Sequence, residues 1–172
     1  WNGWKAKLLQ DLYEAAKRTL DGETPTRERR LDVRRAEAVR LLNLLTVPPD
    51  NYAAFWKQLG PAYFLRNDPQ DIAWHTRVFA GKGDGEPIVR TRMSPMGDGF
   101  QVAVWLRDQP DLFARICGYF DSRNLSVLDA KIHTTDDGRA LDSFVVVDPM
   151  GQVEHYRNIL PMVESELTQR LA

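Results

Sequence analysis

The feature that most constrains the fold is a change in the spacing of apolar residues part-way along the chain. Up to about residue 80 they recur three and four positions apart, as on one side of an α-helix. From Ile88 onward, short runs alternate apolar and polar residues, which is typical of half-buried strands. A Gly-rich run at 81–85 separates the two patterns and is expected to be a linker. We therefore predict an α+β chain, with an amino-terminal helical connector at residues 1–85 and a second domain at 86–172.

The order of elements in the second part narrows the fold further. From residue 100 the patterns predict a strand, a helix opened by Gln109-Pro110-Asp111, two strands joined by the Asp-Gly turn at 135–138, and a last helix. Pro110 is expected at the first helical position, where no N–H is needed. This βαββα order predicts a ferredoxin-like sandwich that lacks its last strand. Residues 88–93 offer an added antiparallel strand that would extend the sheet.

The strand expected at 140–148 is apolar on both sides. Phe144 and Val146 point to one face of the strand, whereas Val145 and Val147 point to the other. A strand with two apolar faces is expected to be covered on both. One cover is the helix pair of the sandwich, and the other is either the amino-terminal helices or a partner subunit.

Composition excludes several classes of function. With 23 basic and 24 acidic residues, the formal net charge is −1, so no overall field attracts nucleic acid or an anionic membrane. The Arg-rich stretch at 27–40 is interleaved with acidic residues, which favours a solvated helix face or a domain contact over nucleic-acid binding. No run approaches the roughly 18 apolar residues of a membrane span. The single Cys117 fits a reducing compartment, so we expect a cytoplasmic protein.

Other features of the sequence predict no chemistry. His75, His133 and His155 are scattered without metal-ligand spacing, so no metal site is expected. The chain begins at Trp1 and its first methionine is Met93, so we expect it to be a piece of a longer protein.

Two stretches of the second part resemble a known family. Residues 102–120, which contain Arg107-Asp108-Gln109-Pro110-Asp111-Leu112-Phe113, look like the first strand and helix of an ACT domain, a small regulatory module that binds amino acids and has a βαββαβ fold. Residues 124–135 and 138–146 are similar to the first ACT domain of the bacterial protein-PII uridylyltransferase/uridylyl-removing enzymes. Upstream, residues 63–66 and 72–75 resemble the segment before the ACT pair of that family. The resemblance covers nearly all of the chain.

The resemblance implies a regulatory role without catalysis. Enzymes of this family transfer UMP from UTP to a tyrosine of the nitrogen signal protein PII and remove it again, and glutamine biases the two activities through the ACT region. Their nucleotidyltransferase domain is recognised by Gly-Ser followed by paired Asp residues, and their hydrolytic domain by a His-Asp doublet. Neither Gly-Ser nor His-Asp occurs in this sequence. We therefore expect no catalytic residue and no cofactor in this segment, with magnesium bound by the catalytic domains of the parent enzyme.

The same resemblance implies where an amino acid would bind. The turn formed by Asp108, Gln109, Pro110, Asp111 and Leu112 would present the N–H groups of a helix start to the carboxylate of a ligand. Side chains such as Asp108 and Gln109 would receive its ammonium or amide group. In ACT domains the ligand commonly also meets the start of the second strand of a partner, which is near Ser126 here.

One departure favours an alternative function. Ligand-binding ACT turns often read Asp-x-Pro-Gly, where glycine lets the ligand approach the backbone. This chain has Asp111 at the glycine position, and its carboxylate would repel the carboxylate of an amino acid. Together with the missing last strand, this favours a ligand-free interaction or dimerisation module that associates through its sheet.

Overall fold

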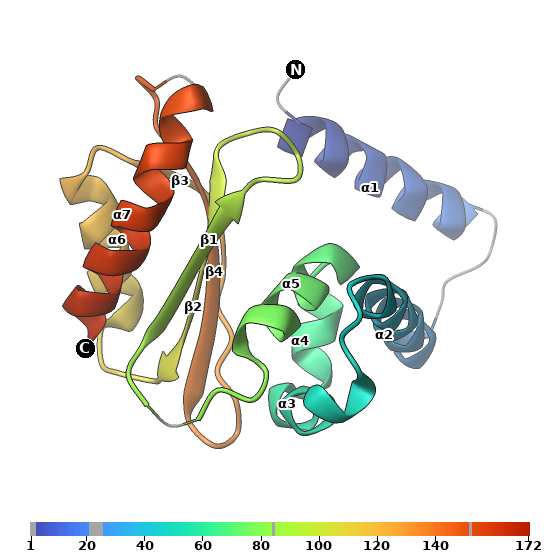
Figure 1. Ribbon diagram of the computed structural model, residues 1–172. Coiled ribbons are helices and arrows are strands. Elements are labelled where there is room, and N and C mark those ends of the chain that lie inside the picture. The colour runs from blue at the N-terminus through green and yellow to red at the C-terminus, as the bar shows by residue number, and fades with distance from the viewer. Residues whose placement is uncertain (1–2, 21–25, 84, 152) are drawn as a thin grey trace.

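Figure 1 shows the computed structural model, which describes residues 3–20, 26–83, 85–151 and 153–172. The amino-terminal part is helical, as its apolar spacing predicts. Its elements are α1 (Gly3–Leu20), α2 (Arg27–Leu44), the 3-10 helix η1 (Pro49–Asn51), α3 (Ala53–Leu59), α4 (Pro61–Arg66) and α5 (Pro69–Phe79). Proline begins both α4 and α5, because its fixed φ suits the first helical position.

The second part forms one antiparallel sheet and two helices. Its elements are β1 (Ile88–Met93), β2 (Phe100–Arg107), α6 (Leu112–Ser122), β3 (Ser126–Lys131), β4 (Arg139–Val147) and α7 (Val153–Leu171). The strand order is β1-β2-β4-β3, and every neighbouring pair is antiparallel. In the turn of the β3–β4 hairpin, Gly138 has a φ of +83°, which glycine adopts without strain. The α+β class and the ferredoxin-like arrangement are confirmed.

β1, the first strand of the domain, takes the sheet position that the last strand of a βαββαβ sandwich would occupy. In a βαββαβ sandwich the last strand would pair with the first strand of the motif, which is β2 here. β1 pairs with that edge of β2, from Ile88 opposite Trp105 to Met93 opposite Phe100. The expectation that residues 88–93 add an antiparallel strand is therefore confirmed. The sheet has four strands although the chain carries no strand after α7.

Both faces of the sheet are covered by helices. Figure 1 shows α6 and α7 on one side of the sheet and α3, α4 and α5 on the other. We call these the helix-pair face, where Val104 and Phe144 lie, and the connector face, where Trp105 and Leu141 lie. Neighbouring residues of one strand reach opposite cores because side chains alternate along a strand. The second cover is therefore the amino-terminal helices of the same chain.

The helical part and the sheet share one apolar core. Trp105 of β2 packs edge-on against Phe55 of α3, with ring centroids 5.4 Å apart, and also lies near Phe79 of α5. The predicted linker at 81–85 connects these parts, although Asp84 lies outside the described residues. Division of the chain at residue 85 stays a prediction, because the two parts bury apolar surface against each other.

Candidate functional site

The turn between β2 and α6 holds most of the predicted site residues. Helix α6 begins at Leu112, and Asp111 is the residue that caps it. Pro110 therefore lies before the helix, and the expectation that it takes the first helical position is wrong. The physical reason is the backbone of Asp111, whose φ of 58° and ψ of 21° are left-handed and turn the chain into the helix.

Asp111 takes the backbone conformation that glycine takes most readily. Asp is one of the few other residues that visits this region, at an energetic cost. Its side chain is exposed and makes no capping hydrogen bond to the helix. The N–H of Leu112 donates to the carbonyl of Gln109 at 3.3 Å, but no side chain of Asp111 caps the following N–H groups of α6, which suit an anion. The Asp111 carboxylate itself opposes such an anion.

The side chains of Asp108 and Gln109 differ in the hydrogen bonds that they already make within the protein. The backbone N–H of Asp108 donates to the carbonyl oxygen of Gly138 at 2.9 Å, which ties this turn to the β3–β4 hairpin. The side chain of Asp108 is exposed and accepts from the N–H of Gln109 at 2.9 Å. The amide of Gln109 donates to the carbonyl of Leu171 at 3.1 Å and accepts from the guanidinium of Arg115. Of the two, Asp108 is the one free to meet a ligand ammonium group.

Ser126 is not brought to this turn within one chain. It pairs with Val147, at one end of β4, whereas Arg107, just before the turn, pairs with Arg139 at the other end. With a rise of about 3.3 Å per residue, the length of β4 puts the two places roughly 25 Å apart. A site that uses both the turn and Ser126 therefore needs a second module.

One buried carboxylate near the turn is not among the predicted site residues. Asp142 of β4 is 1% exposed and shares the helix-pair face with Ala140 and Phe144 by strand alternation. Its Oδ1 accepts from the N–H of His133 at 3.3 Å. Burial is the main cause that raises the pKa of Asp142 to about 6; the hydrogen bond from His133 acts in the opposite direction, and the charge of Asp108 adds to the rise. The sequence signal for it is an acidic residue at an inward position of an apolar strand.

Other reactive residue types have structural surroundings. Cys117 is half-buried on α6 beside the core of the helix-pair face, and burial raises the pKa of its thiol. Within the part of the chain that the structure describes, no group of three or more His, Cys, Asp or Glu side chains is placed to hold a metal ion. None of the described helices combines the length and the apolar character that crossing a membrane requires.

Comparison with known proteins shows the enzyme family to which the chain belongs. A family model described as the fifth domain of uridylyltransferase GlnD matches residues 26–78. A bifunctional uridylyltransferase/uridylyl-removing enzyme from Ralstonia nicotianae is 53% identical over 176 residues, which cover 100% of this chain and 20% of that protein. The chain corresponds to a segment of the bifunctional uridylyltransferase/uridylyl-removing enzymes. It spans about a fifth of the length of the relatives that it matches.

Further uridylyltransferase/uridylyl-removing enzymes match over the same extent. Those of Burkholderia mallei and Burkholderia thailandensis are each 50% identical over 173 residues, which again cover 100% of this chain and 20% of the relative. The match includes both the helices and the sheet, so the two parts occur together in this enzyme family. No solved structure matches the chain.

Proposed function

We propose that the chain is a regulatory, amino-acid-sensing ACT segment of a cytoplasmic enzyme that uridylylates protein PII and removes the uridylyl group in response to glutamine. The observation that carries this proposal is the β2–α6 turn. Its backbone is left-handed at Asp111, where ligand-binding ACT turns have glycine, and it leads into an uncapped helix start. The similarity of the whole chain to uridylyltransferase/uridylyl-removing enzymes supports the choice of parent.

In this proposal the segment senses and the rest of the enzyme catalyses. UMP transfer to PII, its hydrolytic removal and magnesium binding belong to the remaining four-fifths of the parent's length. Glutamine would place its carboxylate near the N–H groups of Phe113 and Ala114, because the N–H of Leu112 already donates to the carbonyl of Gln109, and its ammonium group near Asp108. Ser126 would come from a second ACT module, because it lies at the far end of the sheet in its own chain.

A second candidate function is a ligand-free interaction or dimerisation module. Two observations favour it: the amide of Gln109 is engaged by Leu171 and Arg115, and the Asp111 carboxylate stands where a ligand carboxylate would approach. This module would associate through the open edge of β3. It predicts a dimer in sedimentation experiments and a melting temperature that glutamine does not change.

Glutamine titration of turn variants tests the first candidate against the second. Asp111→Gly removes the opposing charge and keeps the left-handed backbone, so we expect glutamine to bind roughly tenfold more tightly to the variant. Asp108→Asn removes the carboxylate for the ammonium group and should weaken binding by a similar factor. Asp121→Asn, an exposed carboxylate later on α6, is the matched control. Equal glutamine affinity in all four proteins would contradict sensing at this turn.

A further inference from the structure

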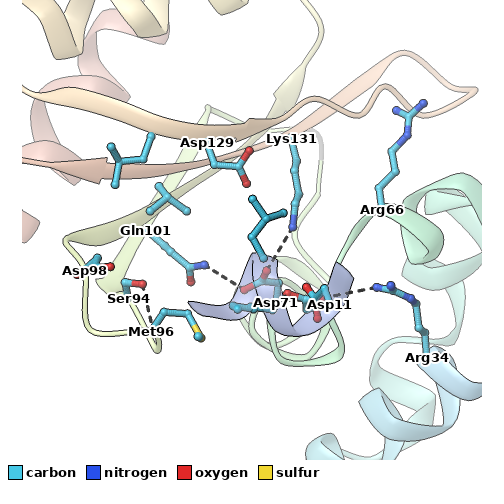
Figure 2. Close-up of a pocket in the computed structure, with 15 residues that line it drawn as sticks. Asp11, Arg34, Arg66, Asp71, Ser94, Met96, Asp98, Gln101, Asp129 and Lys131 are labelled. Atoms are coloured by element: carbon cyan, nitrogen blue, oxygen red, sulfur yellow. Dashed lines mark hydrogen bonds and ion pairs between the residues drawn. The ribbon is translucent and has the colours of Figure 1, made fainter. Parts of the chain in front are cut away.

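A cavity lies on the connector face, away from the β2–α6 turn. It has a volume of about 390 Å³, within the range of sites for small molecules. Side chains from seven elements and the β1–β2 hairpin converge on it, as Figure 2 shows for most of them. The lining residues are Lys7, Leu8, Asp11, Arg34, Arg66, Asp68, Asp71, Ser94, Met96, Asp98, Gln101, Leu128, Asp129, Lys131 and Val145. We call it the connector cavity.

The connector cavity carries charges of both signs at different places. Figure 2 shows Arg34 and Arg66 on one side and Ser94 and Asp98 on the opposite side, with two residues of β3 between them. The charged lining has four cations and five carboxylates. A nearly neutral wall of this kind disfavours a polyanion such as a nucleotide, and it suits a ligand that itself carries one charge of each sign.

Several of these charges compensate one another within the protein. Asp68 forms ion pairs with Lys7 of α1 and with Arg34 of α2, the second with a separation of 3.7 Å. Asp71 accepts from the amide of Gln101 at 3.1 Å and lies 3.8 Å from Lys131. These contacts fix the cavity wall, because Asp68 joins α1 and α2 to the start of α5, and Asp71 joins α5 to the sheet.

Asp129 and Arg66 carry opposite charges in the lining, and neither side chain has a counter-ion among the described residues. Among the residues that the structure describes, the carboxylate of Asp129 of β3 makes no hydrogen bond or ion pair, and the residue is exposed and lines the cavity. Arg66 of α4 has no carboxylate partner within the same described ranges and only donates to the carbonyl of Ile132 at 3.4 Å. One uncompensated carboxylate and one uncompensated guanidinium are complementary to an ammonium and a carboxylate group.

A bulge in β3 adds an apolar surface between these charges. The register of β3 against β4 shifts between Val127 and Asp129, so Leu128 joins Asp129 in lining the cavity. Val145 of β4 and Leu8 of α1 contribute further apolar lining. Methylene groups of a small ligand would pack there while its polar ends meet the charges.

We propose that the connector cavity binds a small zwitterion of the α-amino-acid class. Its ammonium group meets Asp129, its carboxylate meets Arg66 once this exposed side chain turns from the carbonyl of Ile132 into the cavity, and its side chain contacts Leu128 and Leu8. The site is separate from the β2–α6 turn, because its sheet residues belong to the connector face. A ligand here bridges α1 to the sheet and so links the start of the segment to its sensor fold.

The test uses L-glutamine as the probe, with two analogues that each lack one charge. In the analogues 4-carbamoylbutanoate has no ammonium group and 4-aminobutanamide has no carboxylate. Calorimetry on the full 172-residue chain gives the affinity, and amide chemical shifts give the place of binding. We expect glutamine to shift the signals of Leu128, Lys131 and Val145, and each analogue to bind at least tenfold more weakly, because one charge pair is lost.

Substitutions of exposed residues locate the site without disturbing the core. We expect Asp129→Asn and Arg66→Gln each to weaken glutamine binding at this site about tenfold. The matched controls Asp121→Asn on α6 and Arg157→Gln on α7 should bind as the parent chain does. Thermal melting of each variant checks that its fold is retained.

The outcomes separate this inference from the proposed turn function. Shifts at 128–145 that disappear in Asp129→Asn, but persist in Asp108→Asn, support the connector cavity whatever happens at the turn. Shifts confined to 108–112 would support glutamine sensing at the turn and overturn the inference. Equal binding of glutamine and both analogues, or binding of none of the three, would also overturn it.

Discussion

The two faces of the sheet are covered by cores of different chemistry. The core of the helix-pair face is rich in Val, Leu and Ile side chains from the strands, α6 and α7. In the apolar cluster that Trp105 joins on the connector face, more than half of the buried side chains that the structure describes are aromatic, namely Phe55, Tyr63, Phe64, Trp74, Phe79 and Trp105. The connector face also contains polar anchors, such as the 2.7 Å hydrogen bond between the hydroxyl of Tyr63 and Nδ1 of His75.

The difference reflects how each face is formed. The helix-pair face is covered by α6 and α7, which are connected directly to its strands, and dispersion between well-packed aliphatic side chains suffices there. The connector face is covered by a separate layer of helices. The orientation of these helices on the sheet must be fixed, in addition to the burial of their apolar side chains. Hydrogen bonds such as Trp56 Nε1 to Thr76 Oγ1 at 2.9 Å, and the Arg92–Asp71 ion pair at 2.8 Å, orient that layer. Both faces also bury ionisable side chains, among them Asp142 on the helix-pair face and His75 on the connector face.

Removal of the central aromatic side chain of the connector face should have the largest effect. Trp105 is 2% exposed, so Trp105→Ala should lower the free energy of unfolding by about 3–5 kcal/mol. Trp105→Phe keeps an aromatic ring and removes an indole N–H that has no hydrogen-bond partner among the described residues, so its loss should be smaller, about 1 kcal/mol. Chemical denaturation measures both.

The control for Trp105 is Tyr13→Ala on α1, where the side chain is 68% exposed. This variant should change stability by less than about 0.5 kcal/mol. Because the two layers share a core, Trp105→Ala should still unfold in one transition. Two separate transitions would show that the helical layer and the sheet fold independently.

Acid should weaken the connector face through His75. Burial lowers the pKa of His75 to about 4 from 6.5, so the folded state binds fewer protons than the unfolded state between these values. The contribution of neutral His75 to the free energy of unfolding is fully present above pH 6.5. It is lost, by about 3 kcal/mol, as the pH drops toward 4. Denaturation of His75→Asn across this range should lack that fall, whereas His155→Asn, at an exposed position, should retain it.

Asp142 should make the helix-pair face respond to pH in the opposite direction. Its pKa of about 6 exceeds the ordinary value of 3.8, so the folded state binds more protons and loses stability as the pH rises from 4 to 6. Asp142→Asn should therefore be more stable than the parent by about 2–3 kcal/mol at pH 7 and similar to it at pH 4. Asp121→Asn is the matched exposed control. A gain that is the same at both pH values would contradict a buried charge.

The smallest effect is expected where the helix-pair layer begins. Asp111→Gly removes the strain of a left-handed backbone at a non-glycine residue, but it also raises the conformational entropy of the unfolded chain. The free energy of unfolding should therefore rise by only about 0.5 kcal/mol. Ala114→Gly, two residues into the same helix, has no such strain to relieve and should lose about 0.5–1 kcal/mol. Melting temperatures compare the two. A loss in both variants would mean that Asp111 stabilises the turn by other contacts.

Much of the fold could be predicted because its signals are local. The two apolar sides of β4 predict that both faces of this strand are covered, and the Asp-Gly pair predicts the hairpin at 135–138. Alternation in β2 predicts a half-buried strand, whereas β2 is buried on both faces because the amino-terminal helices cover the second one. The sequence predicts that α6 starts two residues too early, because Pro110 fits a first helical position as well as it fits the turn before the helix. Only the backbone conformation of Asp111 distinguishes the two.

The candidate sites depended more on tertiary structure. The sequence predicted the turn at 108–112, since its residues are consecutive. Ser126, which is expected to come from a partner, lies at the opposite end of the sheet in its own chain. No sequence pattern indicates that Gln109 is engaged by the end of α7. No sequence motif marks the connector cavity, because its lining residues are scattered along the chain from Lys7 to Val145.

The sequence by itself determined the element types, the order of strands and helices, and the two apolar sides of β4. These follow from periodicities of two and 3.6 residues, which act between near neighbours along the chain. Tertiary structure decided that β1 takes the open edge of β2, that the amino-terminal helices cover the connector face, and that Asp129 and Arg66 line one cavity. Those outcomes depend on which distant surfaces bury the most apolar area together, and that is a property of the whole packed chain.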